Sequence, residues 1–428
     1  MMPTLLPLLF VAAYLAIALE GPLKINKSAT ALLGAGVLWI VYGLLAGDAA
    51  RVNLQLSESL VGTAQIVFFL IAAMAIVEVI DAHDGFELLT TAIQTRRLST
   101  LMWLVGLFTF FLSSILDNLT TTIVMLSLMK RLLGDRQDRL TFAGLIVIAA
   151  NAGGAWSPIG DVTTTMLWIG GQVTSLAIMQ SVFLASIVNL LVPLSAAAWM
   201  AGTRSVVAPP KADAGDALPT SPLERTVVLS LGLASMVLVP AFKSLTHLPP
   251  FMGLLLGLGL LWLVADLLHR RKDDDHKRHL TLVSALARID MGSIVFFIGI
   301  LLAVAALEHG HVLASLARWL EATVGRLDLI VLAIGLASAV VDNVPLVAAS
   351  MGMYDLAQYP ADHFLWAFMA YCAGTGGSIL IIGSASGVAA MGLERIDFMD
   401  YLRKTSGLAL AGYLAGALVY LVQYRCLH

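Results

Sequence analysis

The sequence predicts an all-α polytopic membrane protein, built as an inverted repeat of five spans plus one re-entrant hairpin each, with broken helices at the midplane. Composition, a series of long apolar runs and a duplicated Asp-Asn pair support this prediction. The 428 residues are 59% apolar and 12% charged, whereas a soluble domain has roughly 45–50% and about 25%. So few charges cannot cover a water-facing surface, which excludes a soluble enzyme. A net charge of −3 also offers no basic surface to nucleic acid.

Ten apolar runs are long enough to cross a bilayer, because a spanning helix needs ~20 mostly apolar residues. The first run ends at Glu20 rather than at a small-residue cleavage site, so it predicts a retained helix and not a signal peptide. Two cysteines are too few for a disulfide framework. The predicted spans are about 3–19, 29–47, 62–80, 140–170, 177–201, 226–246, 250–268, 291–307, 363–392 and 405–425.

Two further apolar stretches, 99–133 and 327–355, are each interrupted by an Asp-Asn pair. Their arms, about 13–18 residues long, are short for a full crossing. Short arms that meet at a polar tip predict re-entrant hairpins, which enter the membrane and return to the same side. The two pairs are Asp117-Asn118 and Asp342-Asn343.

The distribution of basic residues favours this topology. With both stretches as hairpins and the N-terminus outside, 20 of the 25 Lys and Arg residues fall in inside loops, as the positive-inside rule requires. If 99–133 crossed instead, the later loops would invert and the bias would be lost. We therefore expect a multi-pass protein of the cell inner (cytoplasmic) membrane with both termini outside. The five outside cations are Arg51, Lys243, Arg318, Arg326 and Arg425.

The two halves of the chain resemble each other. In each half, three spans are followed by a hairpin with Asp-Asn at its tip, a Gly-rich span and a closing span. Because the halves start from opposite sides, they form an inverted repeat, the usual build of a secondary transporter. Gly153, Gly154 and Gly160 align without a gap with Gly376, Gly377 and Gly383. The predicted parts are a first repeat 1–202 (hairpin 99–133, broken span 140–170), a cytoplasmic linker 203–224, and a second repeat 225–428 (hairpin 327–355, broken span 363–392).

The Asp-Asn tips are the first candidate site. An ionised carboxylate at bilayer depth costs several kcal/mol, so such residues are rare and usually functional. Helix breaks also free backbone carbonyls that can replace an ion's water shell. The alternative is that Asp117 and Asp342 only cap the returning arms as N-cap residues. Their matching places in the two repeats favour the functional interpretation, with oxygen ligands that suit a small, hard cation.

The broken span 151–165 is the second candidate site. Its glycines and Pro158 disfavour a continuous helix. The alternative, close helix packing through glycine, does not explain Asp161 beside the break. The second repeat has Ser384 in place of Asp161, so the predicted site is asymmetric. Glu78 is either a proton-pathway residue or an interfacial acid. The remaining candidate oxygen donors are Asn151, Ser157, Thr163, Thr164, Thr165, Thr375, Ser378, Ser384 and Ser386.

At these residues the chain resembles the NhaD-type sodium/proton antiporters of the ion transporter superfamily. The tandem Asp-Asn pairs and the motif Gly160-Asp161-Val-Thr-Thr carry the resemblance, which covers nearly the whole chain. It implies exchange of sodium or lithium for protons, no cofactor, and a homodimer with a scaffold and a moving part. Pro345 stands where the first repeat has Thr120, so the second tip lacks that hydroxyl. The motif positions that match are Asp117, Asn118, Asn151, Asp161, Thr163, Thr164, Asp342 and Asn343.

Two other functions agree with parts of this sequence pattern. A sodium-coupled or proton-coupled carrier of dicarboxylate, sulfate or arsenite could share the fold, but an Asp at both tips would repel an anion. An intramembrane aspartyl protease is disfavoured, because the Gly-x-Gly-Asp motif is absent before Asp161 and the duplication stays unexplained. The prediction is therefore a transporter and not an enzyme. Sodium at Asp117, Asp161 and Asp342 is expected to compete with protons for the carboxylates, whose pKa burial would raise.

Overall fold

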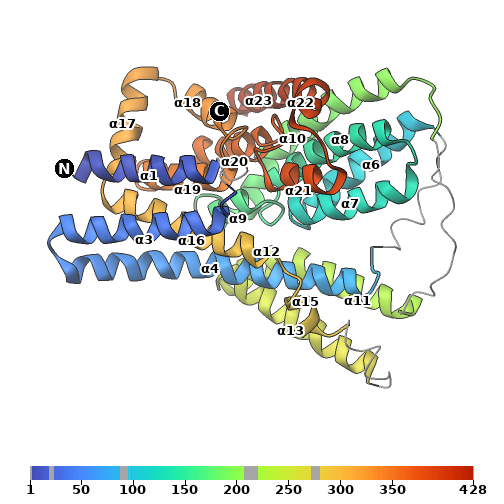
Figure 1. Ribbon diagram of the computed structural model, residues 1–428, viewed down its shortest axis with the longest axis horizontal. Helices are drawn as coiled ribbons and strands as arrows, with labels where there is room; N and C mark the ends of the chain where they lie inside the picture. Colours follow the sequence, from blue (N-terminus) through green and yellow to red (C-terminus); the bar gives the residue numbers. More distant parts are fainter. Residues whose placement is uncertain are drawn as a thin grey trace.

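The computed structural model describes residues 2–18, 24–86, 95, 97–206, 220–270 and 280–427. These residues are mostly helical (Figure 1). The helices are α1 (Met2–Ala18), α3 (Lys27–Ala46), α4 (Ala49–Ala82), α6 (Leu98–Ser113), α7 (Asn118–Leu132), α8 (Arg136–Ala155), α9 (Val162–Ile169), α10 (Ser175–Ala201), α11 (Pro222–Val237), α12 (Val239–Thr246), α13 (Pro250–His269), α15 (Leu282–Leu286), α16 (Met291–His309), α17 (Val312–Val324), α18 (Leu327–Ala337), α19 (Asn343–Met353), α20 (Phe364–Gly376), α21 (Ala385–Glu394), α22 (Phe398–Tyr401), a π-helical turn (Leu402–Ser406) and α23 (Gly407–Leu427).

The helices form two groups that lie side by side in Figure 1. One group, called here the framework, contains α1, α3, α4, α11–α13 and α16, in which α3 packs on α16 and α4 packs on α13. The other, called the core bundle, contains α6–α10 and α18–α23, in which α10 packs on α23, α6 on α8 and α18 on α20. Segments from both halves of the chain therefore contribute to each group.

Six helices among the described residues are long and apolar enough to cross a membrane, or seven if the bent pair α11 and α12, at 43°, forms one span. The other three predicted spans do not form one long helix each. The run 3–19 forms the 17-residue α1, and the runs 140–170 and 363–392 are each divided into two helices. The prediction of an all-α polytopic membrane protein is confirmed. Two further differences are that α4 begins at Ala49 rather than near residue 62, and that α17 had not been expected.

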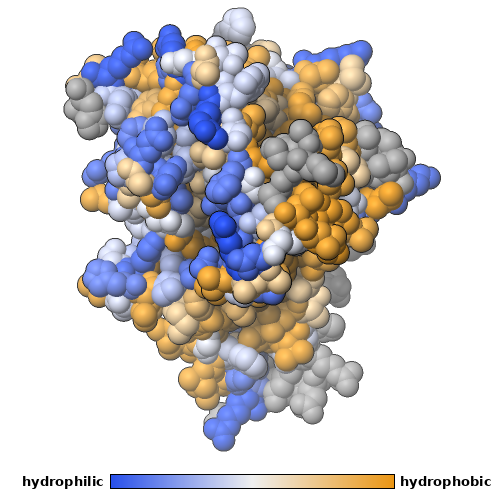
Figure 2. Space-filling model, turned by 90° about the vertical axis from the view of Figure 1, so that its left-hand side faces the viewer, coloured by the Kyte–Doolittle hydropathy of each residue, from blue (hydrophilic) through white to orange (hydrophobic). Residues whose placement is uncertain are grey.

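The surface is consistent with a lipid solvent. Leu33, Leu44, Trp199 and Leu245 are each at least 70% exposed, and apolar surface on this scale marks contact with a membrane or another protein. Figure 2 views the end of the molecule at the left of Figure 1 and shows hydrophilic residues gathered between hydrophobic flanks.

The two hairpin stretches are divided where the Asp-Asn pairs lie. The arms α6 and α7 have 16 and 15 residues, and α18 and α19 have 11 each. At ~1.5 Å per residue, every arm is shorter than the ~30 Å hydrocarbon core of a bilayer. In both stretches the second arm begins immediately after the aspartate, which is its N-cap.

The glycines of the two broken spans make matching close approaches. A Cβ on Gly153 would collide with the carbonyl oxygen of Phe110, and one on Gly376 with that of Gly335. The hydroxyl of Ser113 donates to the carbonyl of Ala150 at 2.6 Å, as that of Ser338 does to Ala373 at 2.8 Å. Each hairpin is thus fixed against its neighbouring broken span by the same contacts, at equivalent positions of the two halves.

Candidate functional site

The tip of the first hairpin is ordered by its aspartate. Asp117 caps α7: its Oδ1 accepts from the Thr120 backbone N–H at 2.8 Å, and its Oδ2 accepts from the Thr120 hydroxyl at 2.7 Å. The neighbouring Asn118 is buried. The capping role that the sequence left as an alternative is therefore present, and it occupies one lone pair on each carboxylate oxygen.

The second tip is similar but has fewer hydrogen bonds. Asp342 caps α19 by accepting from the Val344 backbone N–H at 3.3 Å. Pro345 follows where Thr120 stands in the first half, so no hydroxyl reaches this carboxylate from that position. Lys27, at the start of α3, lies within electrostatic range of Asp342. No sequence pattern singles out this lysine.

Asn151, at the C-terminal end of α8, connects the two halves. Its Oδ1 accepts from Asn118 Nδ2 at 3.0 Å. Its Nδ2 donates to Ser378 Oγ at 2.8 Å and to Ser384 Oγ at 3.0 Å. All four side chains are at most 4% exposed. One amide therefore ties the first hairpin to the break in the second Gly-rich span.

Asp161 is the N-cap of α9 and is 2% exposed. Its Oδ2 accepts from the Thr163 hydroxyl at 2.8 Å and from Asn343 Nδ2 at 3.4 Å. On the other side it faces Gly374, where a Cβ would lie 3.1 Å from Oδ2. A buried carboxylate is thus held by a hydroxyl of its own half and by the amide of the opposite hairpin.

Four of the other predicted hydroxyls are buried and bonded to the backbone, whereas the buried hydroxyl of Ser386 has no hydrogen-bond partner within the described part of the chain. Thr164 donates to the Ala155 carbonyl at 3.3 Å, Thr165 to that of Pro158 at 3.0 Å, and Thr375 to that of Tyr371 at 2.6 Å. Ser157 Oγ accepts from the Ile159 backbone N–H at 3.4 Å. These contacts give each group a structural role and leave oxygen lone pairs available.

Asp161 lies within electrostatic range of both Asp117 and Asp342, although the three carboxylates are not placed to share one metal ion. Within the described ranges, no three His, Cys, Asp or Glu side chains are placed so that they could hold a metal ion. A cation near Asp117, Asp161 or Asp342 would therefore take most of its ligands from amide, hydroxyl and backbone oxygens around one carboxylate.

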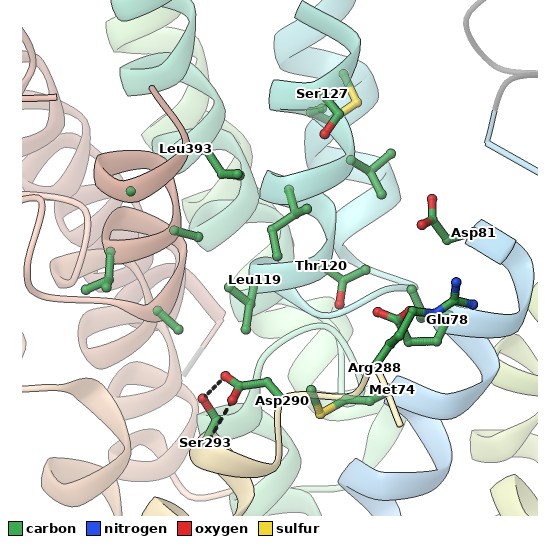
Figure 3. A pocket seen from close by; sticks show the side chains of 18 of the residues that line it. Met74, Glu78, Asp81, Leu119, Thr120, Ser127, Arg288, Asp290, Ser293 and Leu393 are labelled. Atoms are coloured by element: carbon green, nitrogen blue, oxygen red, sulfur yellow. Dashed lines mark hydrogen bonds and ion pairs between the residues drawn. The ribbon is translucent and has the colours of Figure 1, made fainter. Parts of the chain in front are cut away.

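A cavity of about 710 Å³ lies between the framework and the core bundle. Figure 3 shows its wall, with Thr120 and Leu119 on one side and Glu78 and Arg288 on the other. Thr120 is the residue whose hydroxyl binds Asp117, and Ala385, next to Ser384, also lines the cavity. The cavity therefore runs from the C-terminal end of α4 to the tip of the first hairpin and to the break in the second Gly-rich span.

Glu78 lies on the wall of this cavity. Its Oε2 lies 3.3 Å from Arg288 Nε, and its side chain is 29% exposed. Asp290, which caps α16 and accepts from Ser293, also lines the cavity (Figure 3). Sequence reasoning missed Arg288 as a partner of Glu78, because a contact between distant parts of the chain depends on how the helices pack.

The fold and the site together define a class of protein. Discontinuous helices that meet around buried polar groups, inside a largely apolar surface, are typical of membrane transporters. A family model described as "Citrate transporter" matches residues 14–374 of the chain.

Individual relatives indicate the family more narrowly. Sodium/proton antiporter 1 of Arabidopsis thaliana is 49% identical over 98% of this chain and 72% of its own length. Sodium/proton antiporter 2 of the same plant is 45% identical over 98% and 99%. The Na(+)/H(+) antiporter NhaD of Vibrio cholerae is 30% identical over 97% and 90%. The chain belongs to the NhaD-type sodium/proton antiporter family.

Proposed function

We propose that the protein is a secondary transporter that exchanges sodium, or lithium, for protons across a membrane. The observation that carries this proposal is Asp161, a carboxylate buried at a helix break and held by Thr163 and Asn343. Ionisable residues at such depth are costly and serve transport. The relatives named sodium/proton antiporters support the same ions.

Exchange follows from competition for the same oxygens. A carboxylate with amide and hydroxyl oxygens beside it suits a small, hard cation. When Asp161 is protonated, one of its oxygens becomes a donor and the negative charge is lost, so the cation no longer binds there. Asp117 and Asp342 act in the same way at the two tips. Proton entry down its gradient would then drive sodium out.

The chain is organised, in this proposal, as two inverted repeats, 1–202 and 225–428, with the hairpins re-entrant and the helix breaks at the midplane. The short hairpin arms and the matching contacts of Gly153 and Gly376 support it. The cytoplasmic linker 203–224 lies largely outside the described residues, which omit 207–219. Like the superfamily it resembles, the protein is proposed to work as a homodimer.

The cavity gives the site an open side. The 20 to 5 distribution of basic residues supports an orientation in which the C-terminal end of α4, and with it the cavity, faces the cytoplasm of an inner membrane and both termini lie outside. Single cysteines at Gly134 and Ala357, which follow the two hairpins, should then react with an impermeant reagent from the inside and the outside respectively. Reaction of both from one side would refute the re-entrant hairpins and the inverted repeat.

The decisive test is ion flux in proteoliposomes. A sodium gradient should release protons from vesicles that hold the protein, with no anion required. The match to a citrate transporter model favours one competing function, a carrier of organic anions. Citrate, succinate and sulfate are therefore the control substrates. Uptake of one of them, without sodium-evoked proton release, would replace the antiport proposal by that alternative.

A further inference from the structure

Lys243 of α12 contacts the end of a half-helix in the core bundle. Its ammonium group donates to the carbonyl oxygen of Trp168 at 2.7 Å and lies 4.5 Å from the centre of the Trp168 ring. Trp168 is 1% exposed and belongs to the last turn of α9. The contact therefore joins the framework to the helix whose first residue follows Asp161.

The position of this ammonium suits the chemistry of a helix end. The last carbonyls of a helix have no partners within the helix, and the C-terminus carries partial negative charge. A cation that also lies on an indole face gains cation–π attraction. Lys243 thus contacts one end of α9 and Asp161 caps the other, with a helix of eight residues between them.

The equivalent half-helix of the second repeat is held differently. The carbonyl oxygen of Leu393, in the last turn of α21, accepts from Lys130 Nζ at 2.9 Å. Lys130 belongs to α7, which is part of the core bundle like α21 itself. Each half-helix therefore has a lysine at its C-terminal end, but only the Lys243 contact crosses from the framework to the core bundle.

The helices pack closely on the side of the molecule that holds Lys243, whereas the cavity opens on the other side. On the cavity side, open space separates α4 from α7 and α21 (Figure 3). On the opposite side α19 packs on α16 and α17. A Cβ on Gly352 of α19 would lie 2.7 Å from Leu313 and 3.2 Å from Glu308.

We propose that Lys243 is a positioning residue that holds α9 against the framework while the cavity side is open, and that it must release Trp168 before the site opens to the other side. This inference rests on the proposed function, because exchange requires the site to open alternately to both sides. Loss of the ammonium should shift the balance of states toward the one that opens beside α19.

The test compares cysteine reactivity on the two sides in a background without Cys372 and Cys426. Ser127, on the cavity wall, and Leu313, which packs on Gly352, are replaced singly by cysteine. Each variant is labelled with a hydrophilic maleimide in lipid nanodiscs, where both faces are accessible. In Lys243→Met, labelling of the Leu313 cysteine should accelerate about tenfold, the factor that one hydrogen bond to a charged group supplies. Labelling of the Ser127 cysteine should not accelerate.

Two matched variants separate this role from simple loss of stability. Lys243→Arg keeps a cation and should restore the original labelling rates. Lys130→Met removes the same type of contact inside the core bundle and should leave the Leu313 cysteine unchanged. Equal labelling of that cysteine with and without Lys243, or faster labelling of both cysteines, would overturn the proposal. The labelling rates need no ion gradient, so they test the role of Lys243 separately from ion transport. Absence of sodium–proton exchange in the flux experiment would instead refute the proposed function.

Discussion

The two broken spans meet at the centre of the molecule. Their backbones make equivalent contacts, but their polar side chains differ. Gly153 and Gly376 make equivalent approaches to carbonyl oxygens of the hairpins. In contrast, the first span contributes Asn151 and Asp161, whereas the positions that align with them in the second are Gly374 and Ser384.

Because of this difference, the two breaks contribute different groups. The absence of a side chain at Gly374 leaves room for the Asp161 carboxylate, while the amide of Asn151 is bound by the hydroxyl of Ser384. At the breaks themselves, the first half supplies a charge through Asp161, and the second half supplies space at Gly374 and a neutral hydroxyl at Ser384. The two halves therefore repeat the backbone geometry, whereas the polar groups at the two breaks differ.

Removal of the charge from Asp161 should have the largest effect. Asp161→Asn keeps the size of the side chain but cannot hold a proton or a negative charge. A hydrogen bond to a charged group contributes roughly 1.5–3 kcal/mol, a factor of about 10–100 in affinity, and the variant also loses the exchangeable proton. Sodium-evoked proton release in proteoliposomes should disappear, with normal insertion in the membrane. Unchanged exchange would mean that Asp161 only caps α9.

The sequence was sufficient for part of this arrangement. Composition and run length predicted the polytopic helical class, and Pro158 and the glycines predicted the break before Asp161, because each of these signals acts locally. It could not predict that Asn343 would reach Asp161 or that Lys243 would reach Trp168, since contacts across 182 and 75 residues depend on how the helices pack. Arg288, paired with Glu78, was missed for the same reason.

The two tip aspartates should differ less from each other than either does from Asp161. Asp117→Asn and Asp342→Asn preserve an oxygen that can still cap α7 and α19. Each should raise the apparent sodium KM about tenfold or more, by loss of a charge-assisted contact. The Thr120 hydroxyl already occupies part of the Asp117 carboxylate, whereas the Asp342 carboxylate has no such hydroxyl at the equivalent position and has more of its charge available for a cation. Asp342→Asn should therefore have the larger effect. Initial rates measured over a range of sodium concentrations give these KM values. If neither variant changed the KM, both aspartates would serve only as helix caps.

The pH dependence tests whether ion and proton share the carboxylates. Raising the pH removes protons from these groups and frees them for sodium, so the apparent sodium affinity should improve as pH rises. For one competing proton per ion, the improvement approaches about tenfold per pH unit and levels off above the pKa of the site. Sodium KM values measured at several pH values give the slope. An affinity constant over two pH units would require separate routes for sodium and protons.

Substitution of Ser384 should give the smallest of these effects. Its side chain is neutral, and Ser378 also accepts a hydrogen bond from Asn151. The Ser384 hydroxyl oxygen accepts from Asn151 Nδ2 at 3.0 Å and from the Gly387 backbone N–H at 3.2 Å. In Ser384→Ala, Asn151 keeps its contacts with Ser378 at 2.8 Å and with Asn118 at 3.0 Å. The loss of about 1 kcal/mol expected for a neutral hydrogen bond corresponds to roughly a fivefold increase in sodium KM. Ser384→Thr retains the hydroxyl and serves as the control. If Ser384→Ala were as damaging as Asp161→Asn, the charge would not be the decisive difference between the halves, and the two breaks would have to contribute equally to the site.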